Sequence, residues 1–315
     1  MEKVIEVAQL QKSYPLPKPA ANGSKEFQAI KGTSFFVERG EIFGILGPNG
    51  AGKTTTLEII EGLKRQSSGT VTVLGIDNLQ HPEEIKKRIG VQLQSSEYLP
   101  FLTLHELLDL FASIYGQTAP VKKLLALVNL TEKEHSQVKN LSGGQKQRFT
   151  IATSLVNQPE ILFLDEPTTG LDPAARHSLW DLIKQINATG ITIVLTTHYM
   201  EEAEFLCHRV AIMDKGTILK IDAPRKLIEQ LSDTVQVAFF TEKNIDAALL
   251  QSLPGIKNIH NEHPKVLLEV ESLERVSGIV YLLKKEGISF SGFTVKTASL
   301  EDVYLQLTGK EYEGG

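Results

Sequence analysis

The stretch that decides the fold is Gly47-Pro48-Asn49-Gly50-Ala51-Gly52-Lys53-Thr54. It has two glycines, a lysine and a threonine at the spacing of a phosphate-binding loop. Residues 42–46 before it are apolar, as a buried parallel strand should be, and residues 55–62 after it read as a helix ended by glycine. The loop therefore stands between a strand and a helix, which is the context that the motif requires.

The residue types of the loop suit phosphate binding. Glycines let the backbone approach phosphates closely, and N–H groups at a helix N-terminus form an anion-binding nest. We expect Lys53 to reach the β- and γ-phosphates and the Thr54 hydroxyl to bind Mg²⁺. A chance glycine-rich turn is the alternative, and the flanking pattern argues against it. The predicted ATP-binding residues here are Gly47, Pro48, Asn49, Gly50, Ala51, Gly52, Lys53, Thr54 and Thr55.

Composition and charge exclude several classes of protein. The 315 residues, 41% hydrophobic and 23% charged, fit a soluble globular chain with one large and one smaller domain. A net charge of −5 argues against a general nucleic-acid binder, which is normally basic. The single cysteine, Cys207, excludes an intramolecular disulfide and fits a reducing cytoplasm. We find no signal peptide and no apolar run long enough to cross a bilayer, so a role at a membrane needs spans from another chain.

The order of elements predicts two domains. Alternating strands and helices over residues 1–223 indicate an α/β domain with a mainly parallel core sheet, a small antiparallel β subdomain and a helical subdomain at about 95–157. Residues 15–26 read as an exposed loop, and Thr103 with Glu106 fits a helix capping box. Residues 224–315 read as a small α+β domain of ferredoxin-like type, without a catalytic cluster.

Two carboxylates end the apolar strand expected at residues 161–164. Because side chains alternate along a strand, Asp165 and Glu166 can divide their roles. Asp165 can support Mg²⁺, and Glu166 can act as the general base toward the attacking water. An acidic pair that merely faces solvent is the alternative, and a phosphate-binding loop in the same chain makes it the weaker one.

Three other polar or aromatic residues have both a functional and a structural interpretation. His198 ends a buried strand, at the carboxyl edge where ligands gather in parallel sheets, although a lone histidine is more commonly a core residue. Gln94 is placed similarly and can reach Mg²⁺ or the water. Tyr14 is a surface aromatic by default and can instead stack on adenine.

A second anion site follows further along the chain. A serine and two glycines at the start of a helix, expected to run over residues 147–157, form another phosphate nest. One nucleotide does not need two nests from one chain, so two chains packed head to tail would each offer one nest to the other's nucleotide. This second motif consists of Leu141, Ser142, Gly143, Gly144 and Gln145.

Together these motifs strongly resemble those of the ATP-binding cassette ATPases, over residues 4–223. GTPases and kinases of the phosphate-loop class lack the second motif. The resemblance implies that residues 141–145 are the signature that acts on the partner's nucleotide, and that Gln94 is the Q-loop glutamine. It also implies catalytic roles for Glu166, His198 and Gln94, an adenine-stacking role for Tyr14, and Mg²⁺ ligation by Thr54, Gln94 and Asp165. The D-loop would be Gly170, Leu171 and Asp172.

The resemblance implies an ATPase subunit of an ABC transporter. Its partners would be ATP, a second cassette and an integral membrane permease, with no nucleic acid, and it would lie peripherally at the cytoplasmic face of the cell membrane. The tail at residues 298–309 resembles that of bacterial drug, polysaccharide and sodium exporters, which favours export. An apolar stretch at residues 98–102 is either the permease contact or ordinary core. The rival functions are a non-transport ABC ATPase that acts on ribosomes or DNA, and a nucleotide-dependent structural module without turnover.

Overall fold

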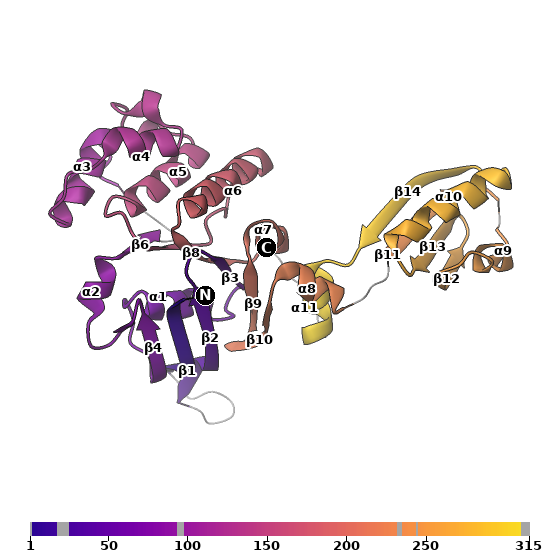
Figure 1. The fold of residues 1–315 in the computed structure, drawn as a ribbon, viewed down its shortest axis with the longest axis horizontal. Coiled ribbons are helices and arrows are strands. Elements are labelled where there is room, and N and C mark those ends of the chain that lie inside the picture. Colours follow the sequence, from indigo (N-terminus) through magenta and orange to yellow (C-terminus); the bar gives the residue numbers. More distant parts are fainter. Residues whose placement is uncertain (1, 18–24, 93–97, 232–234, 244, 310–315) are drawn as a thin grey trace. The chain divides into compact units, whose positions relative to one another are not determined.

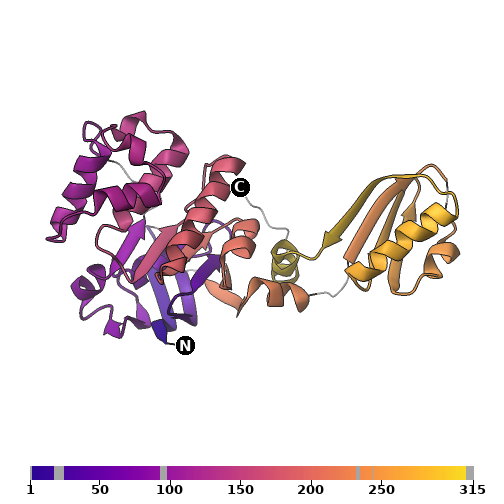
Figure 2. The same cartoon turned by 45° about the horizontal axis from the view of Figure 1, so that its top comes forward.

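A computed structural model describes residues 2–17, 25–92, 98–231, 235–243 and 245–309. The chain divides into two compact units, with the division after Pro224 (Figures 1 and 2). The first unit carries the nucleotide-binding motifs described above, and the tail at residues 298–309 belongs to the second. Among the described residues, no helix has both the length and the apolar character that crossing a membrane requires.

A six-stranded sheet forms the core of the first unit. Five of its strands run parallel, and the sixth, β10, pairs antiparallel at one edge. Every residue of the three central strands β3, β8 and β7 is buried, as expected for a parallel sheet covered on both faces. The strand order is β10(Thr217–Asp222), β9(Arg209–Asp214), β3(Ile42–Leu46), β8(Thr192–Thr197), β7(Ile161–Asp165) and β6(Ile89–Gln92).

An antiparallel sheet packs beside this core. Its order is β2(Glu26–Glu38), β1(Lys3–Pro15), β4(Ser68–Val73) and β5(Ile76–Asp77). Helix α1(Lys53–Ile60) shares one continuous apolar core with both sheets, and the rings of Phe35 on β2 and Phe43 on β3 stack at 5.4 Å. The phosphate loop, between β3 and α1, is therefore flanked by elements of one continuous apolar core.

Close packing also explains a glycine in β3. A Cβ atom at Gly44 would lie 2.6 Å from the Sγ atom of Cys207, which is itself buried. A side chain at position 44 would force one of the two residues to move. Burial also raises the pKa of the Cys207 thiol.

The helices α3, α4 and α5 lie together in one group (Figures 1 and 2). The predicted capping box at Thr103 and Glu106 is confirmed at the start of α3. The predicted start of the signature helix at residue 147 is wrong, because Ser142 caps α5 and the helix begins at Gly143. Helix α7 was not predicted. The bounds are α2(Pro82–Lys86), α3(Leu104–Ile114), α4(Val121–Leu127), η1(Thr131–Lys133), η2(Val138–Asn140), α5(Gly143–Ser154), α6(Pro173–Ala188) and α7(Met200–Leu206).

The second unit has its own antiparallel sheet, in the order β12, β13, β11, β14. Strands and helices alternate as βαββαβ, which is the ferredoxin-like arrangement, and α10 packs into the sheet's apolar core (Figure 2). The fold class predicted from the sequence is confirmed. The bounds are α8(Pro224–Glu229), β11(Val235–Thr241), α9(Ala247–Gln251), β12(Ile256–Glu262), β13(Lys265–Val270), η3(Leu273–Arg275), α10(Val276–Lys285), β14(Phe290–Thr297) and α11(Leu300–Thr308).

Candidate functional site

The phosphate loop needs its glycines for steric reasons. A Cβ atom at Gly47 would lie 2.1 Å from the carbonyl oxygen of Met213. Gly52, the N-cap of α1, has φ +103°, a left-handed conformation that side chains disfavour. The backbone of the loop is therefore folded tightly against β9, with the first N–H groups of α1 left without helical acceptors.

Lys53 is the first residue of α1 and is 4% exposed. Its side chain folds back onto the phosphate loop that precedes it. Its ammonium group donates to the carbonyl oxygens of Gly47, at 2.8 Å, and Pro48, at 3.2 Å. It also forms an ion pair with Glu166 Oε1 at 3.2 Å. Burial lowers the pKa of Lys53, and the charges of Glu166 and Asp165 oppose that shift. A cation thus stands at the loop with a carboxylate as its counter-ion.

Glu166 lies just beyond the end of β7, in a left-handed backbone conformation with φ +47°. The carboxylates of Asp165 and Glu166 diverge at this turn, so strand alternation is the wrong reason for their separation. Glu166 Oε2 is 3.0 Å from Nδ1 of His198. Burial raises the Glu166 pKa, but the charges of Lys53 and His198 outweigh burial, and the net pKa is lowered. A strained backbone at a buried charge is typical of functional sites.

Asp165 makes different contacts. Its Oδ1 accepts hydrogen bonds from the Thr54 hydroxyl, at 3.2 Å, and from the Thr196 hydroxyl. Burial raises its pKa, and the hydrogen bonds from Thr196 and Thr54 oppose the shift. A hydroxyl and a carboxylate side by side are hard oxygen ligands that suit Mg²⁺, which completes its shell with phosphate and water oxygens. Within the described ranges, no cluster of three or more His, Cys, Asp or Glu side chains could hold a metal.

The signature and the D-loop together line one open pocket of about 560 Å³. Ser142 caps α5 by accepting from the N–H of Gln145, while Asp172 caps α6 by accepting from the N–H of Ala175. Two helix N-termini therefore lie at one pocket, whose potential favours an anion. No residue of the chain's own phosphate loop lines it among the described residues. The lining residues are Ser142, Gly143, Gly144, Gln145, Arg148, Gly170, Leu171, Asp172 and Ala175.

Two further predicted site residues are Tyr14 and Gln94. Tyr14 is on β1, half-buried, with the ammonium groups of Lys12 and Lys64 at 5.0 Å and 5.9 Å from its ring centre. Gln94 and residues 95–97 lie outside the described residues, so their predicted roles stay predictions.

The apolar stretch at residues 98–102 divides between core and surface. Tyr98 packs against Phe149 and Phe111 and donates a hydrogen bond to Thr150. Leu99 and Phe101 are 58% and 75% exposed. The core interpretation therefore applies to Tyr98, and the two large apolar side chains of Leu99 and Phe101 remain on the surface.

Sequence reasoning missed two buried carboxylates. Glu61, at the end of α1, is 2% exposed, and burial raises its pKa to about 8, with the charges of Asp165 and Glu58 adding to the shift. Glu202 on α7 is completely buried and accepts hydrogen bonds from Thr168 and Trp180. The pattern Met200-Glu201-Glu202-Ala203 offered a signal, because alanine and glutamate favour a helix directly after His198.

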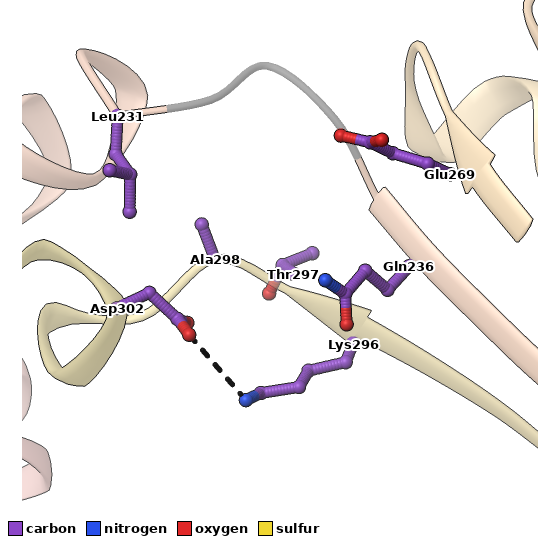
Figure 3. Close-up of a pocket in the computed structure, with 7 residues that line it drawn as sticks. All are labelled: Leu231, Gln236, Glu269, Lys296, Thr297, Ala298 and Asp302. Carbon is purple, nitrogen blue, oxygen red and sulfur yellow. Dashed lines mark ion pairs between the residues drawn. The ribbon is translucent and has the colours of Figure 1, made fainter. Parts of the chain in front are cut away.

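The second unit has a small pocket of its own (Figure 3). In Figure 3 the side chains of Lys296 and Asp302 point toward each other across it, and the two charges are 3.7 Å apart. Lys296 is 64% exposed, so this ion pair is solvated and contributes little. The remaining lining residues are Leu231, Gln236, Glu269, Thr297 and Ala298. No group of three or more His, Cys, Asp or Glu side chains that could hold a metal lies there among the described residues.

Comparison with known proteins agrees with this geometry. A family model described as ABC transporter matches residues 30–169. The chain is 35% identical over 292 residues to the linearmycin resistance ATP-binding protein LnrL of Bacillus subtilis, covering 89% of this chain and 94% of that protein. It is 38% identical over 288 residues to the Nod factor export ATP-binding protein I of Burkholderia pseudomallei, covering 90% and 92%.

Solved structures agree as well. A dimeric post-hydrolysis ATP-binding cassette bound to ADP and Pi has a TM-score of 0.62 and 27% identity, covering 70% of this chain and 98% of that one. An ATP-binding subunit of an ABC transporter has a TM-score of 0.61 and 28% identity, covering 72% and 92%.

The fold and the motif-bearing site define a protein of the ATP-binding cassette class, and the chain belongs to the ABC transporter family. Within that family it is an ATP-hydrolysing subunit, and its ATPase activity drives transport.

Proposed function

We propose that two cassettes close around two Mg-ATP molecules and that each nucleotide is held by residues of both chains. One chain would supply Lys53 and the phosphate loop, and the other would supply Ser142, Gly143 and Gly144. The separate signature pocket carries this proposal, because two helix N-termini face an anion site that the chain's own loop does not line.

The surroundings of Gly143 support the same arrangement. A Cβ atom there would meet no heavy atom within 4 Å, and the backbone is not left-handed, so the fold of the chain itself does not require glycine. Close approach of a ligand from outside does require one. The dimeric relative bound to ADP and Pi is consistent with such a ligand.

Within one chain, we assign the chemical roles by contact. Glu166 would be the general base, because its charge is preserved by Lys53 and by His198 at 3.0 Å. Thr54 and Asp165 would hold Mg²⁺, which neutralises phosphate charge during transfer. When the γ-phosphate arrives, Lys53 would leave Glu166 for the phosphate oxygens, and His198 would keep the carboxylate in place. Gln94 and Tyr14 would contact the Mg²⁺ or water and the adenine, as the family resemblance implies.

The membrane partner would be a separate permease, and the cassette would lie peripherally at the cytoplasmic face. The exposed Leu99 and Phe101 are the side chains we assign to that contact, because both are large, apolar and solvent-facing. We propose export as the direction, because the relatives above are named for export and for resistance to a compound.

A mixing experiment tests the shared site. Lys53→Ala removes the phosphate lysine, and Gly143→Trp fills the open space at the signature. Each variant alone should lose ATP hydrolysis, because both sites of its pair are damaged. An equal mixture should recover about a quarter of the wild-type rate, since half the pairs are mixed and each mixed pair keeps one intact site. Full activity of either variant alone, or no recovery on mixing, would overturn the proposal.

A further inference from the structure

A buried carboxylate that the reaction scheme does not use lies behind the site. Glu202 is 0% exposed and belongs to α7, the helix that follows His198. Its Oε1 accepts hydrogen bonds from the Thr168 hydroxyl and from Trp180 Nε1, each at 2.9 Å. Both donors are themselves buried, Thr168 fully and Trp180 to 1% exposure.

The first donor belongs to the segment that joins the general base to the D-loop. The N–H of Thr169 donates to the carbonyl oxygen of Glu166, and the N–H of Leu171 donates to that of Thr168. The Thr169 hydroxyl also donates to Glu166 Oε2 at 3.2 Å. Residues 166–171 therefore form one hydrogen-bonded turn, and the Thr168 side chain is anchored at its centre.

The acceptor belongs to the segment that carries the histidine. The Thr197 hydroxyl accepts from the N–H of Tyr199, and the Tyr199 ring lies 4.1 Å from the guanidinium of Arg176 on α6. Arg176 also interacts with the charge of Glu202. A single buried carboxylate thus lies where the turn after Glu166, the segment around His198 and α6 meet.

Burying a carboxyl group costs free energy, and hydrogen bonds to that group offset the cost. Burial raises the pKa of Glu202, and hydrogen bonds from Thr197, Trp180 and Thr168 oppose that shift. Two hydrogen bonds to one oxygen offset part of that cost and define the distance between the segments.

We propose that Glu202 is a positioning residue, and that its hydrogen bond from Thr168 holds the turn that carries Glu166 and the D-loop at a fixed place beside His198. The inference rests on the proposed roles of Glu166 and His198. The bond from Trp180 to the same oxygen serves stability, because it joins α6 to α7 without touching the turn.

The two hydrogen bonds can be removed one at a time. Thr168→Val keeps the shape of the side chain and removes the hydroxyl, whereas Thr168→Ser keeps the hydroxyl. Trp180→Phe is the matched control, because it removes the other donor to the same oxygen. ATPase rates across ATP concentrations separate kcat from KM, and thermal unfolding reports the stability of each variant.

We expect Thr168→Val to lower kcat about tenfold, with KM for ATP within about twofold of wild type, as for loss of one buried hydrogen bond. Thr168→Ser should restore most of the rate. Trp180→Phe should lower the melting temperature and keep kcat within about twofold. Adding Thr168→Val to Glu202→Leu should slow hydrolysis no further than Glu202→Leu alone, because Glu202→Leu already removes the acceptor of the Thr168 bond.

Two results would overturn the inference: an unchanged kcat in Thr168→Val, or a Trp180→Phe variant slowed as much as Thr168→Val. Should Thr168→Val not fold, Thr168→Ala removes the same hydroxyl and is judged by the same outcomes. Wild-type protein that does not hydrolyse ATP would refute the proposed function itself, whereas active wild type with insensitive Thr168 variants refutes only the positioning role.

Discussion

Glu166→Gln is the change that tests the site most directly. It keeps the size of the side chain and removes the charge that would accept the water's proton. General base catalysis contributes about 10²- to 10⁴-fold, so we expect kcat to fall by that factor, equivalent to about 3–5 kcal/mol of barrier.

The same change should not weaken ATP binding. Lys53 and Glu166 are 3.2 Å apart, and with an effective dielectric constant near 20 their attraction is about 5 kcal/mol before desolvation is subtracted. ATP must replace this carboxylate at Lys53. Glutamine removes the competitor, so the Kd for ATP should stay the same or become tighter by as much as about tenfold.

Phosphate release measures turnover, and calorimetry with ATP measures binding. Glu160→Gln is a matched control, because Glu160 directly precedes β7 at its other end and pairs with Arg39 and Arg88 on the surface. The control should keep kcat within about twofold. Turnover at the wild-type rate in Glu166→Gln would remove Glu166 from the role of base, and a weaker Kd would refute the competition at Lys53.

Three further predictions concern other residues of the first unit. Lys53→Ala should raise the Kd for ATP at least about tenfold by calorimetry, because it removes a buried cation from the phosphate site, and an unchanged Kd would contradict this assignment. Glu61 has a folded pKa of about 8 against an ordinary 4.5, so the folded state holds a proton that the unfolded state releases, and the free energy of unfolding should fall as pH rises from 4.5 to 8. Glu61→Gln should flatten that dependence in thermal melts, and an equally steep curve in the variant would refute it. Gly44→Ala should lower the free energy of unfolding by about 1–3 kcal/mol, and Cys207→Ala in the same chain should restore most of it. No restoration in the double variant would show that the contact with Sγ is not the cause.

Local patterns were sufficient to predict the fold of the first unit. The loop around Lys53 fixes a strand before it and a helix after it, and the apolar runs ending at Asp165 and before His198 supply the neighbouring strands. Hydrophobic period and turn residues are local signals, so strand existence is predictable while helix ends shift by a few residues. The start of α5 moved from residue 147 to Gly143 because Ser142 and Gln145 form a capping box.

Features that depend on contacts between distant segments were not predictable. Glu166 adopts a left-handed backbone directly after β7, where its N–H donates to Thr196 on a neighbouring strand and its carbonyl oxygen accepts from Thr169. The ion pair between Lys53 and Glu166 joins residues more than a hundred positions apart, and the buried Glu202 reads in the sequence as one charge of an ordinary helix. Such side-chain partners follow from packing, which no single segment encodes.

The burial of the chain's single cysteine has a practical consequence for spectroscopy. Thiol reagents act on accessible thiolates, and Cys207 is both covered and held in its protonated form. A cysteine introduced on the surface would therefore carry a fluorophore or spin label selectively, with the native residue left in place. One label beside the signature and one near the phosphate loop would report directly, as a distance, whether and when nucleotide draws two chains together.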